Sequence, residues 1–211
     1  MLNEILTFQG VDELDALGPL EVLRHAHMAG APFTTRIITL TGQSEVRGSH
    51  GLTFKTDGLL ASTGNPDVLI VAGGGWNARS EEGAWGEAKR ADIPKAIRRM
   101  YAEGSILATV CTGAMLVAAA GLAEGRNLIT HHQAIDELRA AGATIIEARV
   151  VDDGDIVRAG GVTSGLDLAL HLVERFAGAE VTTKISSDLE YERRGTVWTR
   201  ANQTAAAAET R

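Results

Sequence analysis

The sequence predicts an α/β fold with a mostly parallel sheet and helices on both of its faces. Short runs rich in β-branched residues alternate with amphipathic or Ala-rich runs, which is the pattern of repeated strand–helix units. Two runs, at 67–72 and 106–110, are almost entirely apolar, as in strands buried on both faces of a sheet. Aromatic residues make up only 4% of the 211 residues and glycines number 24, so we expect an aliphatic core with many tight turns.

Each expected element follows from a local pattern. The apolar residues of 14–29 are spaced as on the inner face of a helix, and glycines end the helical patterns at 93–103 and 133–141. An Asp-Gly pair between 144–151 and 156–159 is a hairpin signal. The expected strands lie at 5–8, 34–40, 44–56 (a strand or hairpin arm), 67–72, 106–110, 128–130, 144–151 and 156–159. The expected helices lie at 14–29, 93–103, 112–122, 133–141, 163–176 and 180–191.

Length and composition favour one domain with a large core of its own. A chain of 211 residues fits one domain, and neither an internal repeat nor a linker divides it. We assign 1–192 to the domain and expect 193–211, which has little periodicity, to be a loosely ordered C-terminal tail.

Charge and cysteine content exclude several classes of protein. The net charge of −7 disfavours binding to nucleic-acid phosphates. The single cysteine rules out a disulfide within the chain and disfavours a Cys-based zinc site; no other metal-ligand spacing occurs, so we expect no metal. The N-terminal residues lack the pattern of a signal peptide and no apolar run reaches about 18 residues, so we expect a cytoplasmic protein without membrane partners.

Cys111 is the main candidate for chemistry. It lies between a buried strand and an apolar helix, with Gly113 two residues later, which is the strand–turn–helix context of a nucleophile elbow. The N-terminus of that helix should acidify the thiol, and its free amides, notably that of Thr112, could bind an oxyanion. The alternative is a buried structural cysteine, and spacing alone weighs the two evenly.

Possible partners of this thiol lie in three segments. His131 and His132 follow a short strand and could supply a base, although a loop histidine is the simpler interpretation; His50 and His171 have no evident partner. The acids Asp12, Glu13 and Asp15 crowd the start of the first helix. They either cap it, or one of them turns inward as a general acid/base with a raised pKa, and position does not choose among them.

The third segment is the turn Gly73-Gly74-Gly75 after a buried strand. It lacks the G-x-G-x-x-G spacing of a dinucleotide site, and no phosphate-binding GK[ST] motif occurs. We interpret these glycines as a device that lets backbone amides approach a reacting centre.

Four segments in order resemble the ThiJ/PfpI superfamily, whose domain looks like that of class I glutamine amidotransferases, and most closely its isonitrile hydratase branch. They are ELDALGPLEVL (Glu13–Leu23), VLIVAGGGW (Val68–Trp76), ATVCTGAMLVAAAGLAEGRNLITHH (Ala108–His132) and RVVDDGDIVRAGGVTSGLDLAL (Arg149–Leu170). The resemblance implies a flavodoxin-like sandwich and a homodimer. Two positions depart from the pattern, with Ala72 where relatives often have Pro and His132 where the branch often has Trp.

The resemblance also implies a set of site residues. Cys111 matches the elbow nucleophile, and Asp15 matches the buried carboxylate beside its sulfur. Gly74 and Thr112 match the pair of backbone amides, and Val162 matches a residue whose backbone lies close to the sulfur. We therefore assign Cys111, Asp15 and Thr112 as catalytic residues, and Gly74, Gly75, Val162 and His131 as candidates for substrate or oxyanion binding.

These residues lead to one main hypothesis and two alternatives. The main hypothesis is a cofactor-free hydratase that converts isonitriles, as small electrophilic substrates, to N-substituted formamides through the Cys111 thiolate, with Asp15 as general acid/base. One alternative is a non-catalytic sensor of oxidative stress through Cys111. The other is a glyoxalase-, deglycase- or amidase-like member of the same superfamily, which Asp15 and Thr112 disfavour because such relatives usually have Glu and an elbow His.

Overall fold

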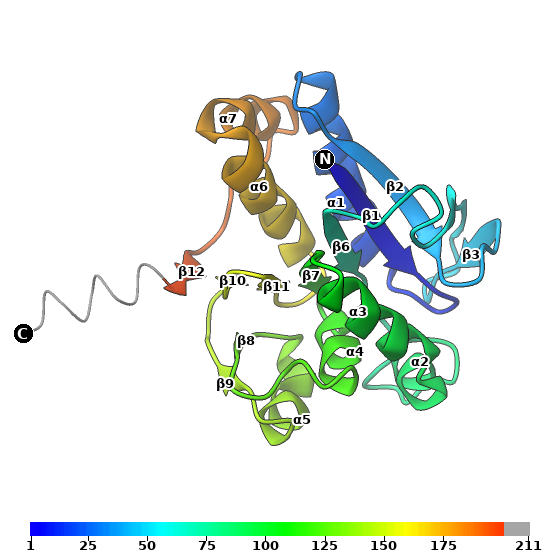
Figure 1. The fold of residues 1–211 in the computed structure, drawn as a ribbon. Helices are drawn as coiled ribbons and strands as arrows, with labels where there is room; N and C mark the ends of the chain where they lie inside the picture. The colour runs from blue at the N-terminus through cyan, green and yellow to red at the C-terminus, as the bar shows by residue number, and fades with distance from the viewer. Residues whose placement is uncertain (201–211) are drawn as a thin grey trace, which may run out of the picture.

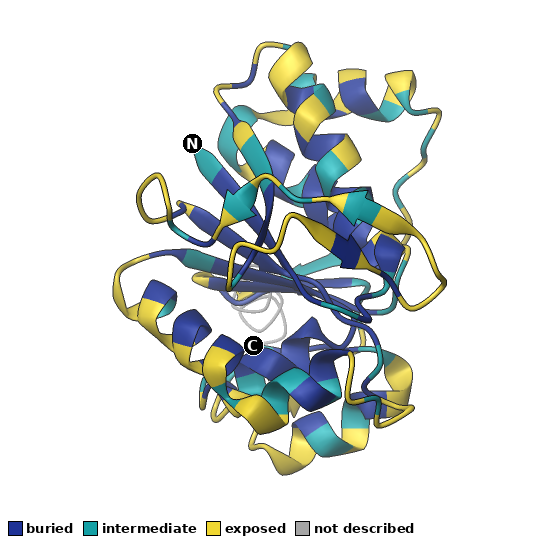
Figure 2. Ribbon diagram, turned by 90° about the vertical axis from the view of Figure 1, so that its right-hand side faces the viewer, coloured by how far each residue is buried: buried dark blue, intermediate teal, exposed yellow. Residues whose placement is uncertain are grey.

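The computed structural model describes residues 1–200 as three layers, with a central sheet between two groups of helices (Figures 1 and 2). The strands are β1 (Leu2–Thr7), β2 (Thr34–Thr39), β3 (Glu45–Arg47), β4 (Thr53–Lys55), β5 (Gly58–Leu59), β6 (Val68–Val71), β7 (Ile106–Val110), β8 (Asn127–Leu128), β9 (Thr144–Ile145), β10 (Val150–Asp152), β11 (Ile156–Ala159) and β12 (Val197–Thr199). The helices are α1 (Glu13–Met28), α2 (Ala84–Arg90), α3 (Asp92–Ala102), α4 (Gly113–Ala119), the 3-10 turn η1 (His132–Ala134), α5 (Ile135–Ala140), α6 (Ser164–Ala177) and α7 (Ala179–Asp188).

The main sheet confirms the predicted α/β class. Its order is β12-β10-β11-β7-β6-β1-β2-β5, and every neighbouring pair is parallel except β10 with β11. α1, α6 and α7 pack together on one face, whereas α2, α3, α4 and α5 pack together on the other. The strand at 68–71 has no exposed residue, as its uninterrupted apolar run predicts.

Four neighbouring strands bring the candidate site together. β11, β7, β6 and β1 lie side by side, and their carboxyl ends lead into the loops that carry Val162, Cys111, Gly74 and Asp12. In open α/β sheets, sites form outside the carboxyl ends of the strands. The topology therefore collects segments up to 150 residues apart in sequence, from Asp12 to Val162, at one edge of the sheet.

The structure differs from the expected elements in several places. α2 has no sequence signal because its seven residues, with a glycine at the third position, carry no apolar stripe; it forms by packing on α3 and α4. The expected strand at 144–151 divides into β9, which pairs with β8 apart from the main sheet, and β10. The segment 44–56 forms the antiparallel hairpin β3–β4.

Part of the expected tail is also ordered. Val197–Thr199 forms β12, which pairs in parallel with β10 at the edge of the sheet, because a short strand can gain backbone hydrogen bonds there without any periodic pattern of its own. The rest of the expected tail, 201–211, lies outside the described residues.

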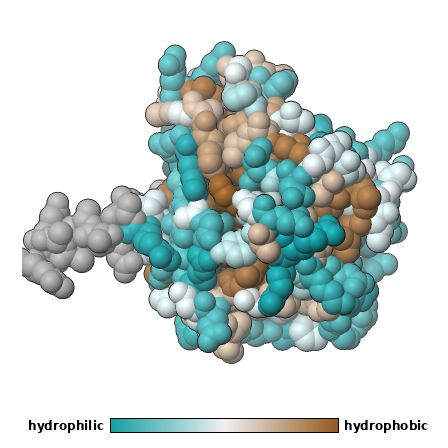
Figure 3. All heavy atoms as spheres, in the orientation of Figure 1, coloured by the Kyte–Doolittle hydropathy of each residue, from teal (hydrophilic) through white to brown (hydrophobic). Residues whose placement is uncertain are grey.

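The face of the molecule seen in Figure 3 is mainly polar. Figure 3 shows hydrophilic side chains over most of one face, with separate hydrophobic patches between them. No helix in the described part of the chain is long and apolar enough to cross a membrane.

Replacing Gly113 by alanine should destabilise the protein. The added Cβ would lie 2.2 Å from the Val71 carbonyl oxygen, so the elbow or the neighbouring strand must move, at a cost of about 1–3 kcal/mol. Urea unfolding followed by circular dichroism measures this loss.

Gly18→Ala is the matched control, because it also places a Cβ on a helix but at 3.6 Å from Leu166, an ordinary contact. Alanine inside a helix should stabilise this variant by roughly 0.5–1 kcal/mol. Equal stability of the two variants would contradict the steric argument.

Candidate functional site

Cys111 lies at the tip of a strained turn between β7 and α4. Its φ is +56°, a left-handed conformation that costs a non-glycine residue on the order of 1–3 kcal/mol. Packing holds this turn in place, since the Cys111 amide donates to the Gly160 carbonyl oxygen at 2.7 Å and Gly113 lies against Val71. The geometry is that of the expected nucleophile elbow. The thiol is free and only 5% exposed.

Asp15 is the acid that faces this thiol. It lies in the first turn of α1, has no exposed surface, and accepts a hydrogen bond from the Gly73 amide at 3.0 Å on Oδ2. Oδ1 receives no hydrogen bond from residues 1–200, and the carboxyl interacts with the Cys111 thiol. Burial, with a smaller contribution from the Asp12 charge, raises the pKa of Asp15 well above its ordinary value. This carboxyl can therefore hold a proton close to the sulfur.

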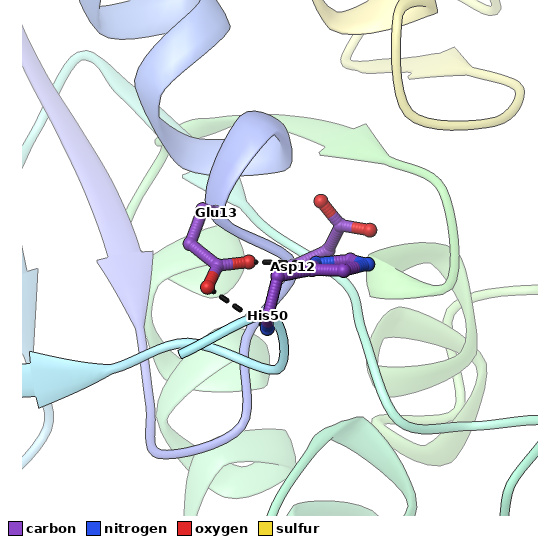
Figure 4. A group of neighbouring side chains, drawn as sticks. All are labelled: Asp12, Glu13 and His50. Atoms are coloured by element: carbon purple, nitrogen blue, oxygen red, sulfur yellow. Dashed lines mark hydrogen bonds and ion pairs between the residues drawn. The ribbon is translucent and has the colours of Figure 1, made fainter. Parts of the chain in front are cut away.

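The other two acids at this helix start have different partners. Asp12 caps α1, with Oδ1 accepting from the Leu14 amide at 3.2 Å. Glu13 accepts from the His50 and Leu52 amides at 2.9 and 3.1 Å and from His50 Nδ1 at 2.8 Å. Figure 4 shows that these contacts connect the loop between β3 and β4, which carries His50, to Glu13 at the start of α1. Spacing alone did not say which of the three acids turns inward, and in the structure it is Asp15, which has no exposed surface.

The thiol is not acidified, contrary to the expectation from the helix N-terminus. The pKa of Cys111 is raised to about 12, because burial and the neighbouring Asp15 carboxylate both disfavour a negative sulfur. Amides of Val162 and Thr112 donate to the sulfur and act in the opposite direction, but they do not outweigh burial. Cys111 and Asp15 therefore resist carrying two negative charges at once.

The glycine turn at 73–75, which follows β6, packs against the elbow that carries Cys111. The Gly74 amide donates to the Thr112 hydroxyl at 2.9 Å, so one member of the expected amide pair already has a side-chain partner. Gly74 has a φ of +120°, and a Cβ there would meet the Asp12 amide nitrogen at 2.3 Å. Only glycine allows this close approach. Of the expected backbone donors, Thr112 and Val162 are the ones that face the sulfur.

A cavity of about 230 Å³ opens above the thiol. The wall includes Gly75 and His131, two of the residues that the sequence put forward as candidates. It also includes Asn77 and Gln133, which carry no sequence signal because only the fold brings the loop after β6 next to the segment before α5. Its lining residues are Asp12, Gly74, Gly75, Trp76, Asn77, Ala78, Cys111, Thr112, His131, Gln133 and Val162. The space suits a small substrate or the reacting end of a larger one.

The group Asp12, Glu13 and His50 has donor atoms within 4.8 Å of one another and is the nearest approach to a metal-binding cluster among residues 1–200. Both Glu13 oxygens already accept N–H bonds from His50, one from its amide and one from its ring. Burial alone would raise the pKa of Glu13, but hydrogen bonds from its own amide, from His50 and from the Leu52 amide hold it below its ordinary value. The hydrogen bond with Glu13 in turn raises the pKa of His50. Sequence patterns missed this pair, as they missed the hydrogen bond of His171 with Asp152 at 2.7 Å.

Residues 4–175 match the model of the DJ-1/PfpI family. The chain is 31% identical over 186 residues to the isonitrile hydratase of Pseudomonas putida, an overlap of 88% of this chain and 76% of that protein. It is 26% identical over 191 residues to the Parkinson disease protein 7 homolog of Danio rerio, an overlap of 88% and 94%.

Two solved structures show the same fold. The crystal structure of Drosophila melanogaster DJ-1beta has a TM-score of 0.77 at 21% identity, covering 91% of this chain and 98% of that chain. A ThiJ/PfpI family protein from Pseudomonas syringae also has a TM-score of 0.77, at 24% identity, covering 92% and 76%.

Asp15→Asn should make the Cys111 thiol more reactive. Removing the carboxylate lowers the pKa of the thiol from about 12, and each unit raises the thiolate fraction about tenfold below that pKa. The rate of alkylation by iodoacetamide between pH 7 and 10 measures this change by intact mass.

Asp12→Asn is the matched control, because the Asp12 charge is the smallest of the influences on the thiol pKa, so its effect should be smaller. Unchanged alkylation in Asp15→Asn, or a larger effect in Asp12→Asn, would mean that Asp15 does not control the sulfur.

Proposed function

Because this chain belongs to the DJ-1/PfpI family, we propose that it is a cysteine-dependent hydratase that converts isonitriles to N-substituted formamides. The observation that carries the proposal is a buried thiol beside a single buried carboxyl group of raised pKa, under a small cavity. The curated isonitrile hydratase with 31% identity supports the same reaction.

The chemistry of an isonitrile fits this pair of groups. The terminal carbon of an isonitrile accepts both the nucleophile and the proton, so the sulfur and the hydrogen of the thiol both add to this one carbon. A thiol with a high pKa is suited to such an addition, because it supplies its own proton through a neighbouring carboxyl. No second base is needed on the far side of the substrate.

In the first step, the Cys111 S–H bond breaks while a C–S and a C–H bond form at the terminal carbon. Asp15 carries the proton from sulfur to carbon, and the product is a thioimidate, R–N=CH–S–Cys111. The oxygen of Asp15 that receives no hydrogen bond is available for this transfer. Because the raised pKa of Asp15 favours its protonated form, the proton stays close to the reacting atoms.

In the second step, water adds across the C=N bond. One water O–H bond breaks, oxygen bonds to carbon, and the proton passes through Asp15 to nitrogen, giving R–NH–CH(OH)–S–Cys111. The C–S bond then breaks as the hydroxyl proton returns to sulfur. The products are R–NH–CHO and the free thiol, so the sum is R–NC + H2O → R–NHCHO.

The same geometry bears on the alternatives. Oxidation of cysteine follows thiolate character and exposure, and Cys111 has a raised pKa and is 5% exposed, which disfavours a role as oxidative sensor. Asp15 in place of a longer acid, and Thr112 after the nucleophile, continue to disfavour a glyoxalase- or deglycase-like reaction.

Turnover of an aryl isonitrile to the formamide, followed by absorbance, tests the proposal. Cys111→Ala should abolish turnover, and Asp15→Asn should lower kcat about 10²–10⁴-fold, the usual contribution of a general acid/base. Lys95→Ala, on the exposed side of α3, should leave turnover unchanged.

Wild-type turnover retained in Cys111→Ala would rule out the mechanism. Absent turnover in a folded wild-type protein would rule out isonitrile hydration itself. Consumption of methylglyoxal, or addition of oxygen atoms at Cys111 under mild peroxide, would then identify which alternative holds.

A further inference from the structure

One wall of the cavity is a hydrogen-bonded bridge between two loops. Asn77, in the loop after β6, donates from Nδ2 to Gln133 Oε1 at 2.9 Å, and Gln133 lies in η1 before α5. Asn77 Nδ2 also lies 3.5 Å from His131 Nδ1. The Gln133 backbone amide donates to the same ring nitrogen at 3.3 Å.

These contacts decide which ring nitrogen of His131 carries hydrogen. Both groups that face Nδ1 are N–H donors, and a nitrogen that accepts hydrogen bonds carries no proton of its own. In a neutral imidazole the hydrogen is then on Nε2. The ring stays neutral because burial and the adjacent His132 lower the pKa of His131, while the Asp12 charge opposes them.

The opposite edge of the ring is turned toward the loop beside the sulfur. A Cβ on Gly161 would lie 3.0 Å from His131 Cδ2 and 3.6 Å from Nε2, and the next residue is Val162, whose amide faces the Cys111 sulfur. His131 also lines the cavity above the thiol. No hydrogen bond within residues 1–200 uses Nε2.

We infer that Asn77 and the Gln133 amide hold His131 as the neutral Nε2–H tautomer, and that this N–H donates a hydrogen bond to the substrate nitrogen in the cavity. The inference deepens the proposed hydratase function and rests on it for the identity of the acceptor. During water addition the nitrogen gains electron density, and a fixed donor stabilises it without transferring its proton. Asn77 and Gln133 are positioning residues, and His131 is not the base of Cys111.

The tautomer can be read directly from the ring nitrogens. Long-range ¹H–¹⁵N spectra of ¹⁵N-histidine-labelled protein at neutral pH distinguish the two tautomers and the imidazolium, and His131→Phe identifies its signals among the six histidines. The wild type should show the Nε2–H tautomer. Addition of the aryl formamide should shift the Nε2 signal of His131.

Two variants that each add one negative charge, at Asn77 or at Gln133, separate the effect of losing the donor at Nδ1 from the effect of charge. Asn77→Asp replaces a donor at Nδ1 by an acceptor, so His131 should change to the Nδ1–H tautomer or to the imidazolium. Gln133→Glu keeps the backbone donor and still accepts from Asn77, so the Nε2–H tautomer should remain. An Nδ1–H tautomer in the wild type, or the same spectrum for Asn77→Asp and the wild type, would overturn the inference.

Kinetics then tests donation to the substrate. His131→Phe should lower kcat for the aryl isonitrile about tenfold or more, as expected for loss of one fixed donor, and His131→Gln, which keeps an N–H at a similar reach, should recover most of it. Equal kcat for His131→Phe and wild type would remove the donor role. If the wild type lacks turnover, the proposed function fails, whereas the spectra still decide the tautomer.

Discussion

The buried contact between the Asp15 carboxyl and the Cys111 thiol is the constraint on which the site depends. Two groups that ionise to anions lie together in an environment that disfavours both charges. The fold maintains this arrangement by supplying one hydrogen bond from Gly73 and by packing the elbow against β6. The consequence is a pair that holds protons tightly, which suits the addition of S–H to a carbon better than attack by a free thiolate.

Glycine is essential to this arrangement where two backbones come close. The loop after β6 approaches both the start of α1 and the elbow so closely that a Cβ on Gly73 would meet the Thr112 amide nitrogen at 2.6 Å. Because side chains are excluded there, the Gly73 amide reaches the Asp15 carboxyl and the Gly74 amide reaches the Thr112 hydroxyl. The outer wall of the cavity is built differently, from side-chain amides and an imidazole that join exposed loops.

Sequence reasoning reached most of the fold and the inner site. Uninterrupted apolar runs located β6 and β7, and the turn between an apolar strand and an apolar helix located Cys111, because these patterns act over a few residues. The same reasoning missed α2 and β12, which are short and depend on packing and edge pairing. It also left His50 without a partner, although Glu13 lies 37 residues away in the chain and 2.8 Å away in space.

What the sequence by itself determined is the alternation of strands and helices, the position of the elbow cysteine, and the family to which the chain belongs. Among the three neighbouring acids the family resemblance indicated Asp15, but only the tertiary structure showed that burial raises its pKa and that the thiol pKa rises rather than falls. Only the tertiary structure brought Asn77 to the ring of His131. The physical reason is that pKa values and tautomers depend on burial and on donors from distant segments, which no local pattern contains.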